Sequence, residues 1–246
     1  MNERPFRIGI YYELPRRHEA PALIADKFLQ SLDALSEIDP LLAKWKVLDL
    51  LAEVSLPLAL ARQRIATIVE NNVDRDDAGR PEPASGYSAI AVTDNAIRSR
   101  LVEFSVGAGR VLKDEMMLRV GDILYPPDPL IVKYAMFRQA ILATSAIWQP
   151  IWAAVSAHRG DYAEEPIIAG APLFPHSAFH IPGIAYVEPA RAVDFALPAE
   201  IRTERTPNGG LLLTATEEPL DPTNPGHLRG ARVVAETMIA QVGYRS

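Results

Sequence analysis

The stretch Thr206-Pro207-Asn208-Gly209-Gly210-Leu211-Leu212-Leu213-Thr214-Ala215-Thr216 joins turn residues to a short apolar run. Proline presets φ and Asn-Gly tolerates a positive φ, so residues 206–210 predict a turn. The apolar run that follows is typical of a buried strand. Asn224 and Pro225 then have the residue types of a helix start, and an apolar stripe of helical period comes after them. A core strand and a core helix therefore enclose an acidic loop that contains Glu217, Glu218 and Asp221.

Outward from this stretch, apolar periodicity predicts further elements. Alternation over residues 6–12 predicts an opening strand. Helical spacing predicts helices over residues 19–38, from Ser55 to Asn72 and from Asp128 to Gln149, while the most polar stretch, 74–86, predicts a loop. Further strands are predicted over residues 87–92, 101–106, 151–157 and 184–187.

The predicted strands and helices are interspersed without regular strand–helix alternation. This favours an α+β fold in which a largely antiparallel sheet packs with about four amphipathic helices. No long linker divides the chain, so we expect a single domain over residues 1–246, with a division into two lobes near residues 122–128 as the alternative.

Composition excludes several kinds of site. The 246 residues include no cysteine, which excludes disulfides, thiolate metal sites and a cysteine nucleophile. No apolar run approaches the roughly 18 residues that a membrane helix needs, and the N-terminus lacks a signal-peptide pattern. We therefore expect a cytoplasmic protein that makes no contact with a membrane.

The net charge of −6 is unevenly distributed along the chain. Residues 161–228 hold 10 acidic and 3 basic residues, which leaves 21 acidic and 22 basic residues elsewhere. Such a segment repels a phosphate backbone and attracts a basic protein, so we expect no direct binding of nucleic acid. The alternative for any single carboxylate is a solvated position that only serves solubility.

The polar loop imitates the start of a calcium-binding loop. Asp74, Asp76 and Gly79 have the expected spacing, but an EF-hand needs an oxygen ligand where Ala78 stands and a glutamate where Ser85 stands. The pattern therefore predicts an acidic surface loop and no calcium site.

Other candidate motifs are also incomplete. His176 and His180 have the spacing of a zinc-binding helix, but Pro175 and Pro182 flank them and no glutamate lies between them. Gly107-Ala108-Gly109 lacks the third glycine of a dinucleotide site. We therefore expect no cofactor and no metal.

The three tryptophans, Trp45, Trp148 and Trp152, have two interpretations. Tryptophan is enriched in the energetic centres of protein interfaces, so each could anchor a partner. Trp148 lies on the apolar stripe of a predicted helix, which favours a place in the core.

Both ends of the chain carry segments with a family resemblance. The N-terminal segments are Ile8-Gly9-Ile10-Tyr11-Tyr12, an arginine at position 16 or 17, Ala25-Asp26-Lys27-Phe28-Leu29, Asp39-Pro40 and Trp45. The C-terminal segments are Ile181-Pro182-Gly183-Ile184-Ala185-Tyr186 and residues 209–216, continued through Asp221, Asn224, Pro225 and His227. In this order they resemble the immunity protein 52 family, which comprises bacterial antitoxins encoded beside polymorphic and type VI secretion toxins.

The resemblance implies a protein that is not an enzyme and that binds and occludes a cognate toxin. The resemblance also implies that this toxin is a nuclease with a restriction-endonuclease-like fold, and a DNase must be basic where it holds DNA. Charge and expected exposure rank the partner-binding candidates as Glu217, Glu218 and Asp221, then Asp161, Glu164 and Glu165, then Asp74, Asp76 and Asp77.

Two other functions stay open from the residues. One is a small hydrolase whose carboxylates and histidines meet only in the folded chain, which would need a deep pocket. The other is an adaptor or chaperone for a secreted effector.

Overall fold

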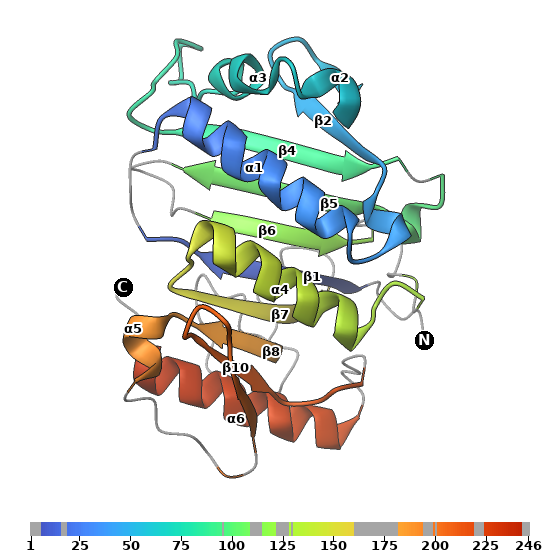
Figure 1. Cartoon of the computed structure of the whole chain (residues 1–246), viewed down its shortest axis with the longest axis vertical. Coiled ribbons are helices and arrows are strands. Elements are labelled where there is room, and N and C mark those ends of the chain that lie inside the picture. Colours follow the sequence, from blue (N-terminus) through green and yellow to red (C-terminus); the bar gives the residue numbers. More distant parts are fainter. Residues whose placement is uncertain are drawn as a thin grey trace.

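The computed structural model describes residues 6–15, 19–94, 96–108, 115–121, 128, 130–159, 182–193, 199, 201–218 and 224–242. Within these ranges ten strands form one sheet in the order β3-β2-β4-β5-β6-β1-β7-β8-β10-β9 (Figure 1). Every pairing between neighbours is antiparallel. The predicted α+β class with an antiparallel sheet is confirmed.

The bounds of the elements are as follows. The strands are β1 (Phe6–Glu13), β2 (Trp45–Asp49), β3 (Val54–Pro57), β4 (Tyr87–Thr93), β5 (Val102–Ala108), β6 (Glu115–Val120), β7 (Trp152–Arg159), β8 (Pro182–Val187), β9 (Arg202–Arg205) and β10 (Leu211–Thr214). The α-helices are α1 (Pro21–Ser36), α2 (Leu58–Ala61), α3 (Ile65–Asn71), α4 (Tyr134–Trp148), α5 (Pro189–Ala192) and α6 (Pro225–Val242). Two 3₁₀ turns, η1 and η2, span Pro40–Leu42 and Arg98–Arg100.

The two faces of the sheet are covered by different helices. In Figure 1, α1 and α4 lie in front of the sheet, and their apolar residues join Ala153 and Val155 of β7 in the larger core cluster. Trp152 and Ala154, which alternate with these residues and so face the other way, belong to a second cluster with Val234 of α6. The alternation along β7 therefore sends neighbouring residues into separate cores.

Buried polar contacts join the front helices to each other and to the sheet. Trp148 Nε1 of α4 donates a hydrogen bond of 2.8 Å to Ser31 Oγ of α1, and both residues are buried. Lys27 Nζ lies 5.4 Å from the Trp148 ring centroid and 2.6 Å from a carboxylate oxygen of Glu19. Trp148 is therefore a core residue, as its position on the helix stripe predicts.

The interpretation of the tryptophans as interface anchors is wrong for all three. Trp45, Trp148 and Trp152 have exposed fractions of 2%, 1% and 6%. Their rings fill the two cores and are not presented to a partner.

Two predicted helix starts are wrong. Ser55, expected to cap a helix, is instead paired with Leu48 inside β3, and the helix begins only at Leu58. Pairing with β2 satisfies backbone groups that a helix start would leave open. The helix expected to start at Asp128 begins at Tyr134, because the Asp128 carboxylate accepts the Leu130 N–H at 2.8 Å and forms a separate turn.

The single helix expected from Ser55 to Asn72 is also divided into two short helices, α2 and α3, by residues 62–64. The other predicted elements agree with the structure to within a few residues. Of the region proposed for a division between lobes, residues 122–127 lie outside the described residues. Among the residues that are described, no helix is both long enough and apolar enough to cross a bilayer.

Candidate functional site

Glu217 and Glu218, the first-ranked candidates, follow β10 and are exposed, with side-chain exposed fractions of 52% and 76%. Each already lies beside a basic side chain of the same protein. Arg202 of β9 forms an ion pair with Glu217, and His227 Nε2 lies 3.3 Å from Glu218 Oε2. Exposure is therefore as expected, but the two charges are partly matched within the chain.

The other described carboxylates of the acidic C-terminal segment are also matched. Glu188 pairs with Arg191 at 2.8 Å, and Glu204 pairs with Arg138 of α4. Asp161, Glu164, Glu165 and Asp221 lie outside the described residues. The described part of this segment thus offers a partner few unbalanced charges.

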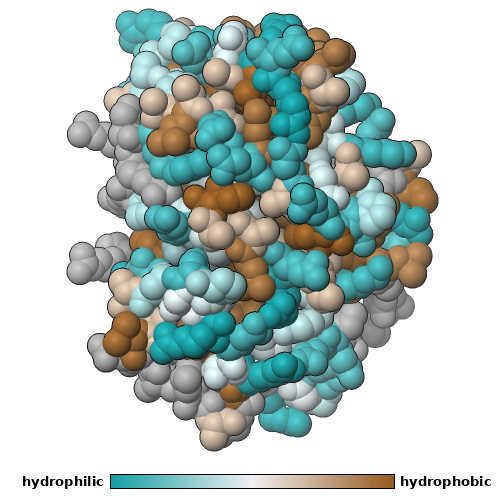
Figure 2. All heavy atoms as spheres, viewed as in Figure 1, coloured by the Kyte–Doolittle hydropathy of each residue, from teal (hydrophilic) through white to brown (hydrophobic). Residues whose placement is uncertain are grey.

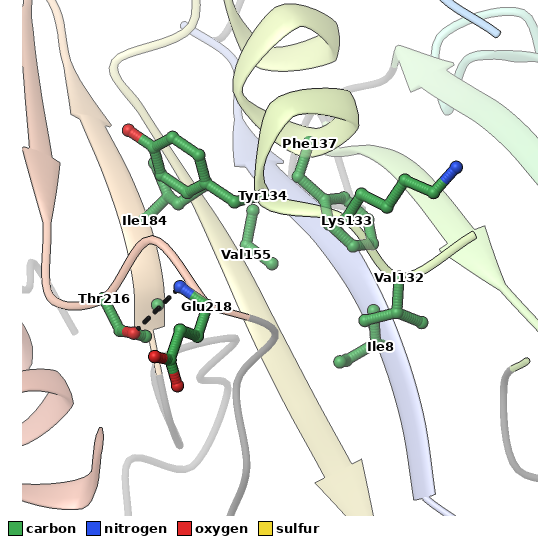
Figure 3. A pocket seen from close by; sticks show the side chains of 10 residues that line it. Ile8, Val132, Lys133, Tyr134, Phe137, Val155, Ile184, Thr216 and Glu218 are labelled. Carbon is green, nitrogen blue, oxygen red and sulfur yellow. Dashed lines mark hydrogen bonds between the residues drawn. The ribbon is translucent and has the colours of Figure 1, made fainter. Parts of the chain in front are cut away.

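A small pocket lies next to Glu218, under the loop that follows β10. Figure 3 shows Glu218 and Thr216 on that loop, with the Lys133 ammonium directed away from the carboxylate. The cavity measures about 20 Å³, enough for about one water molecule, whereas small-molecule sites usually measure about 300–1,000 Å³. The His227–Glu218 pair therefore does not border a substrate-sized space here.

Asp76, a third-ranked candidate, holds its own loop together. Its carboxylate accepts hydrogen bonds from the Ala78 N–H at 3.0 Å, the Arg80 N–H at 2.9 Å and Arg80 Nε at 2.8 Å. These bonds, above all the one from the Arg80 side chain, hold the pKa of Asp76 below its ordinary value. Asp76 is therefore a structural residue of the turn.

Asp74 and Asp77 differ from Asp76, because neither forms an ion pair among the described residues. Burial raises the pKa of Asp74, and the negative charge of Glu82 raises it further. Among the described residues neither Asp74 nor Glu82 has an ion-pair partner, and exposed Asp77 has none either. This loop therefore carries three carboxylates that no ion pair among the described residues balances.

The turn between β2 and β3 is hydrogen-bonded to the end of α3, which directly precedes the same loop. Asn72 connects them, because its side-chain oxygen accepts the Leu50 N–H at 2.8 Å and its side-chain nitrogen donates to the Leu48 carbonyl at 3.1 Å. Segments 49–53 and 70–86 together hold seven acidic and two basic residues. Six of the seven have no ion-pair partner in the described chain, and Asp49 is the one of these that is buried. We name the other five the acidic corner: Glu53, Glu70, Asp74, Asp77 and Glu82.

The sequence ranking missed Glu53, Glu70 and Glu82. In a count over long segments, basic residues such as Arg62 cancel them, although Arg62 pairs in the fold with Asp33 of α1. The only sequence signal is the short-range excess of acidic residues around the polar loop.

The acidic corner and the Glu217–Glu218 loop lie at opposite edges of the sheet. The first residue of β4 and the first residue of β10 lie at the same end of the sheet, because paired residues connect them across the strands between. The pairs are Tyr87–Ala108, Gly107–Glu115, Glu115–Glu13, Glu13–Trp152, Trp152–Val187 and Val187–Leu211. The polar loop precedes β4, whereas Glu217 follows the far end of β10. Six strand spacings also separate β4 from β10, or about 29 Å. The fold therefore does not combine these candidates in one patch.

Comparison with known proteins gives a family match over most of the chain. The family model described as immunity protein 52 matches residues 5–244. No curated protein matches the chain. Among solved structures, the Pseudomonas aeruginosa T6SS protein PA0821 is similar at 12% sequence identity and a TM-score of 0.49, over 95% of this chain and 72% of that one.

Proposed function

We propose that this chain, which belongs to the immunity protein 52 family, is a non-catalytic immunity protein that binds a cognate toxin and covers its working surface. The match over residues 5–244 is the observation that carries this proposal. The toxin we propose is a basic, restriction-endonuclease-like DNase delivered by a secretion system of type VI. Because such a toxin acts on DNA, the proposed place of action is the cytoplasm.

The physical basis of inhibition is competition for a basic surface. A DNase holds the phosphate backbone with lysine and arginine side chains. Clustered carboxylates on an inhibitor steer it toward that surface, raise the association rate and exclude the substrate. Carboxylates that lack an internal cation serve this purpose best, because binding the toxin breaks no existing ion pair.

By this criterion the acidic corner is the first proposed contact surface. Asp74 and Glu82 there repel each other, so a toxin arginine or lysine between them would relieve an unfavourable interaction. Glu217 and Glu218 come second, because each would have to exchange its present partner. Asp161, Glu164, Glu165 and Asp221 remain proposed contacts on charge alone.

Absence of catalysis is also part of the proposal. The pocket beside Glu218 has about 20 Å³, too little for the substrate of a small hydrolase. Among the described residues, no three potential metal ligands gather to activate a water molecule. These observations support inhibition over hydrolysis.

The test is co-expression with the toxin encoded by the neighbouring gene, scored by survival and by binding of the purified proteins. The corner variant Glu70→Gln/Asp77→Asn/Glu82→Gln removes three unpaired charges. At about 0.5 kcal/mol for each exposed charge, it should weaken binding about tenfold. The loss should lie mainly in the association rate and should shrink in high salt.

The matched control is Glu217→Gln/Glu218→Gln, which removes one carboxylate paired with Arg202 and one in contact with His227 and should change affinity less. Equal losses from both variants would contradict the choice of the acidic corner, yet would leave the immunity function standing. Cells that carry the unaltered chain and still die from the toxin would contradict the immunity function itself.

A further inference from the structure

The two outermost strands of the sheet are built differently. An edge strand leaves a row of backbone N–H and C=O groups without a partner, and charged side chains usually protect it from pairing with another chain. On one edge, β9 carries Arg202, Glu204 and Arg205, of which Arg202 and Glu204 are ion-paired. On the other edge, β3 reads Val54-Ser55-Leu56-Pro57 and carries no charge. Only the β9 edge has charged protection.

Exposed apolar side chains surround the unprotected strand. Four large ones fall within Leu50–Leu60, namely Leu50 at 49% exposure, Leu51 at 56%, Val54 at 45% and Leu60 at 63%. Figure 2 shows hydrophobic surface at the upper right of the molecule, over α2, which follows β3 directly. We name Leu50–Leu60 the β3 patch. A row of backbone groups bordered by exposed leucines is the arrangement to which another strand adds.

Within the described chain, β3 has a partner on one side only. Its four residues pair with Lys46–Asp49 of β2. No other hydrogen bond involves the backbone of Val54–Pro57 among the residues that the structure describes. The outward groups of β3 therefore have no backbone partner in that part of the protein.

We propose that the β3 patch is where a second copy of this chain binds, by antiparallel pairing of the two β3 strands. The argument for a second copy is electrostatic. The chain has a net charge of −6, so two copies repel each other over most surfaces. The β3 patch contains Glu53 as its single charged residue in eleven, so the patch itself adds little to that repulsion. A basic toxin would instead gain more from the acidic corner.

The register of such a pair follows from the geometry of strands. Every second residue of β3 directs its backbone N–H and C=O away from β2. Two β3 strands can therefore pair only if the residues opposite each other are both odd-numbered or both even-numbered. A two-fold axis through Ser55 satisfies this condition and sets Val54 opposite Leu56 of the other copy. The two Glu53 residues are then four positions apart, or about 14 Å, which exceeds the screening length of about 8 Å in physiological salt. In physiological salt the two Glu53 carboxylates therefore do not oppose the pairing.

The pairing is short, because Pro57 has no N–H to donate and ends it. An interface of this size is of the weak, reversible kind. Sedimentation equilibrium of the full chain, from about 1 μM to about 1 mM, should therefore show a monomer that becomes a dimer as concentration rises. Val54→Lys should abolish the dimer, whereas the matched change Thr203→Lys on the opposite edge strand should leave it intact.

The natural absence of cysteine gives a second test. Directly opposed residues of an antiparallel pair have Cα atoms about 4.5–5.5 Å apart, within the range that a disulfide bridges. Ser55→Cys should therefore cross-link two copies under mild oxidation, at a rate at least tenfold above that of Thr203→Cys. A monomer throughout the concentration range, or equal cross-linking at both positions, would overturn the proposal. It would also fail if Val54→Lys left self-association unchanged, or if the chain were monomeric and Val54→Lys instead destroyed toxin binding.

Discussion

Replacing Thr144 by valine should destabilise the protein more than replacing Tyr12 by phenylalanine, although both changes remove the same hydrogen bond. Tyr12 lies on central strand β1, and its hydroxyl oxygen is 2.7 Å from Thr144 Oγ1 on α4. Thr144 already donates its own proton to the Ala140 carbonyl at 2.6 Å. The proton in the bond therefore comes from Tyr12, whose side chain is buried with an exposed fraction of 2%.

This assignment sets the size of each effect. In Thr144→Val the Tyr12 hydroxyl stays buried with a proton and no acceptor, which costs about 1–3 kcal/mol. In Tyr12→Phe the Thr144 hydroxyl keeps its bond to Ala140, so the cost is about 0.5–1.5 kcal/mol. The double variant removes the stranded hydroxyl as well, so its cost should fall below the sum of the two single costs. Burial raises the pKa of Tyr12, so its ionisation does not complicate the comparison near neutral pH.

Urea unfolding followed by tryptophan fluorescence measures these differences, provided that the denaturant slope stays constant. Thr237→Val is the matched control, because Thr237 of α6 also donates to a carbonyl four residues earlier, that of Val233 at 2.6 Å. It should cost less than Thr144→Val. A Tyr12→Phe variant at least as damaging as Thr144→Val, or a double variant equal to the sum, would refute the assignment of the proton.

Two further predictions concern the acidic loop and the turn before β10. Because the pKa of Asp76 is lowered in the fold from 3.8, its stabilising effect is fully present above that value and is lost as pH falls through the folded-state pKa. Asp76→Asn should therefore lower the urea midpoint of unfolding near neutral pH. It should also reduce the decrease of that midpoint as the pH is lowered into the acid range. Asp77→Asn removes an equal charge and should have neither effect. Gly210→Ala should cost about 1–3 kcal/mol, because the added Cβ would lie 2.6 Å from Tyr186 Cε2 and 2.7 Å from the Val187 carbonyl oxygen. Gly107→Ala, whose Cβ meets nothing within 4 Å, is its control in the same unfolding assay.

Local chemistry determined the elements that the sequence predicted well. In the turn before β10, the Thr206 N–H bonds the Gly210 carbonyl at 3.0 Å, and Gly209 has a φ of +87°. The Asn224 side chain accepts the Gly226 N–H at 2.8 Å at the start of α6. Each of these features involves residues within four positions of each other, so the residue types alone reveal them.

Strands whose own residue types do not mark them as strands were missed. β9 has the charged sequence Arg-Thr-Glu-Arg and is a strand because it pairs with β10, whose four residues are all buried. β6 was also missed, although it lies next to β1 in the middle of the sheet. The strand order follows from contacts across the whole chain, and no local pattern records it.

The ranking of the candidate contacts changed for the same reason. Counting charges along the chain favours residues 161–228, but Glu204 finds Arg138 from 66 positions away and Glu217 finds Arg202 across the β9–β10 hairpin. The polar loop was correctly predicted to be exposed and acidic, yet its neighbours Glu53 and Glu70 join it only in the fold. Which carboxylates lack a neighbouring cation is therefore decided by the fold and cannot be counted along the sequence.

The acidic corner and the β3 patch share the turn that ends at Glu53, so the two proposed contacts are coupled through charge. Pairing at β3 brings two acidic corners onto one particle, which costs free energy at low ionic strength because the corners repel. Added salt screens that repulsion and should strengthen self-association, whereas it weakens attraction between the corner and a basic toxin. The two contacts should therefore respond to salt in opposite directions. If both weakened together as salt was added, β3 pairing would have to rest on attraction between unlike charges, which the single charge of the patch does not supply.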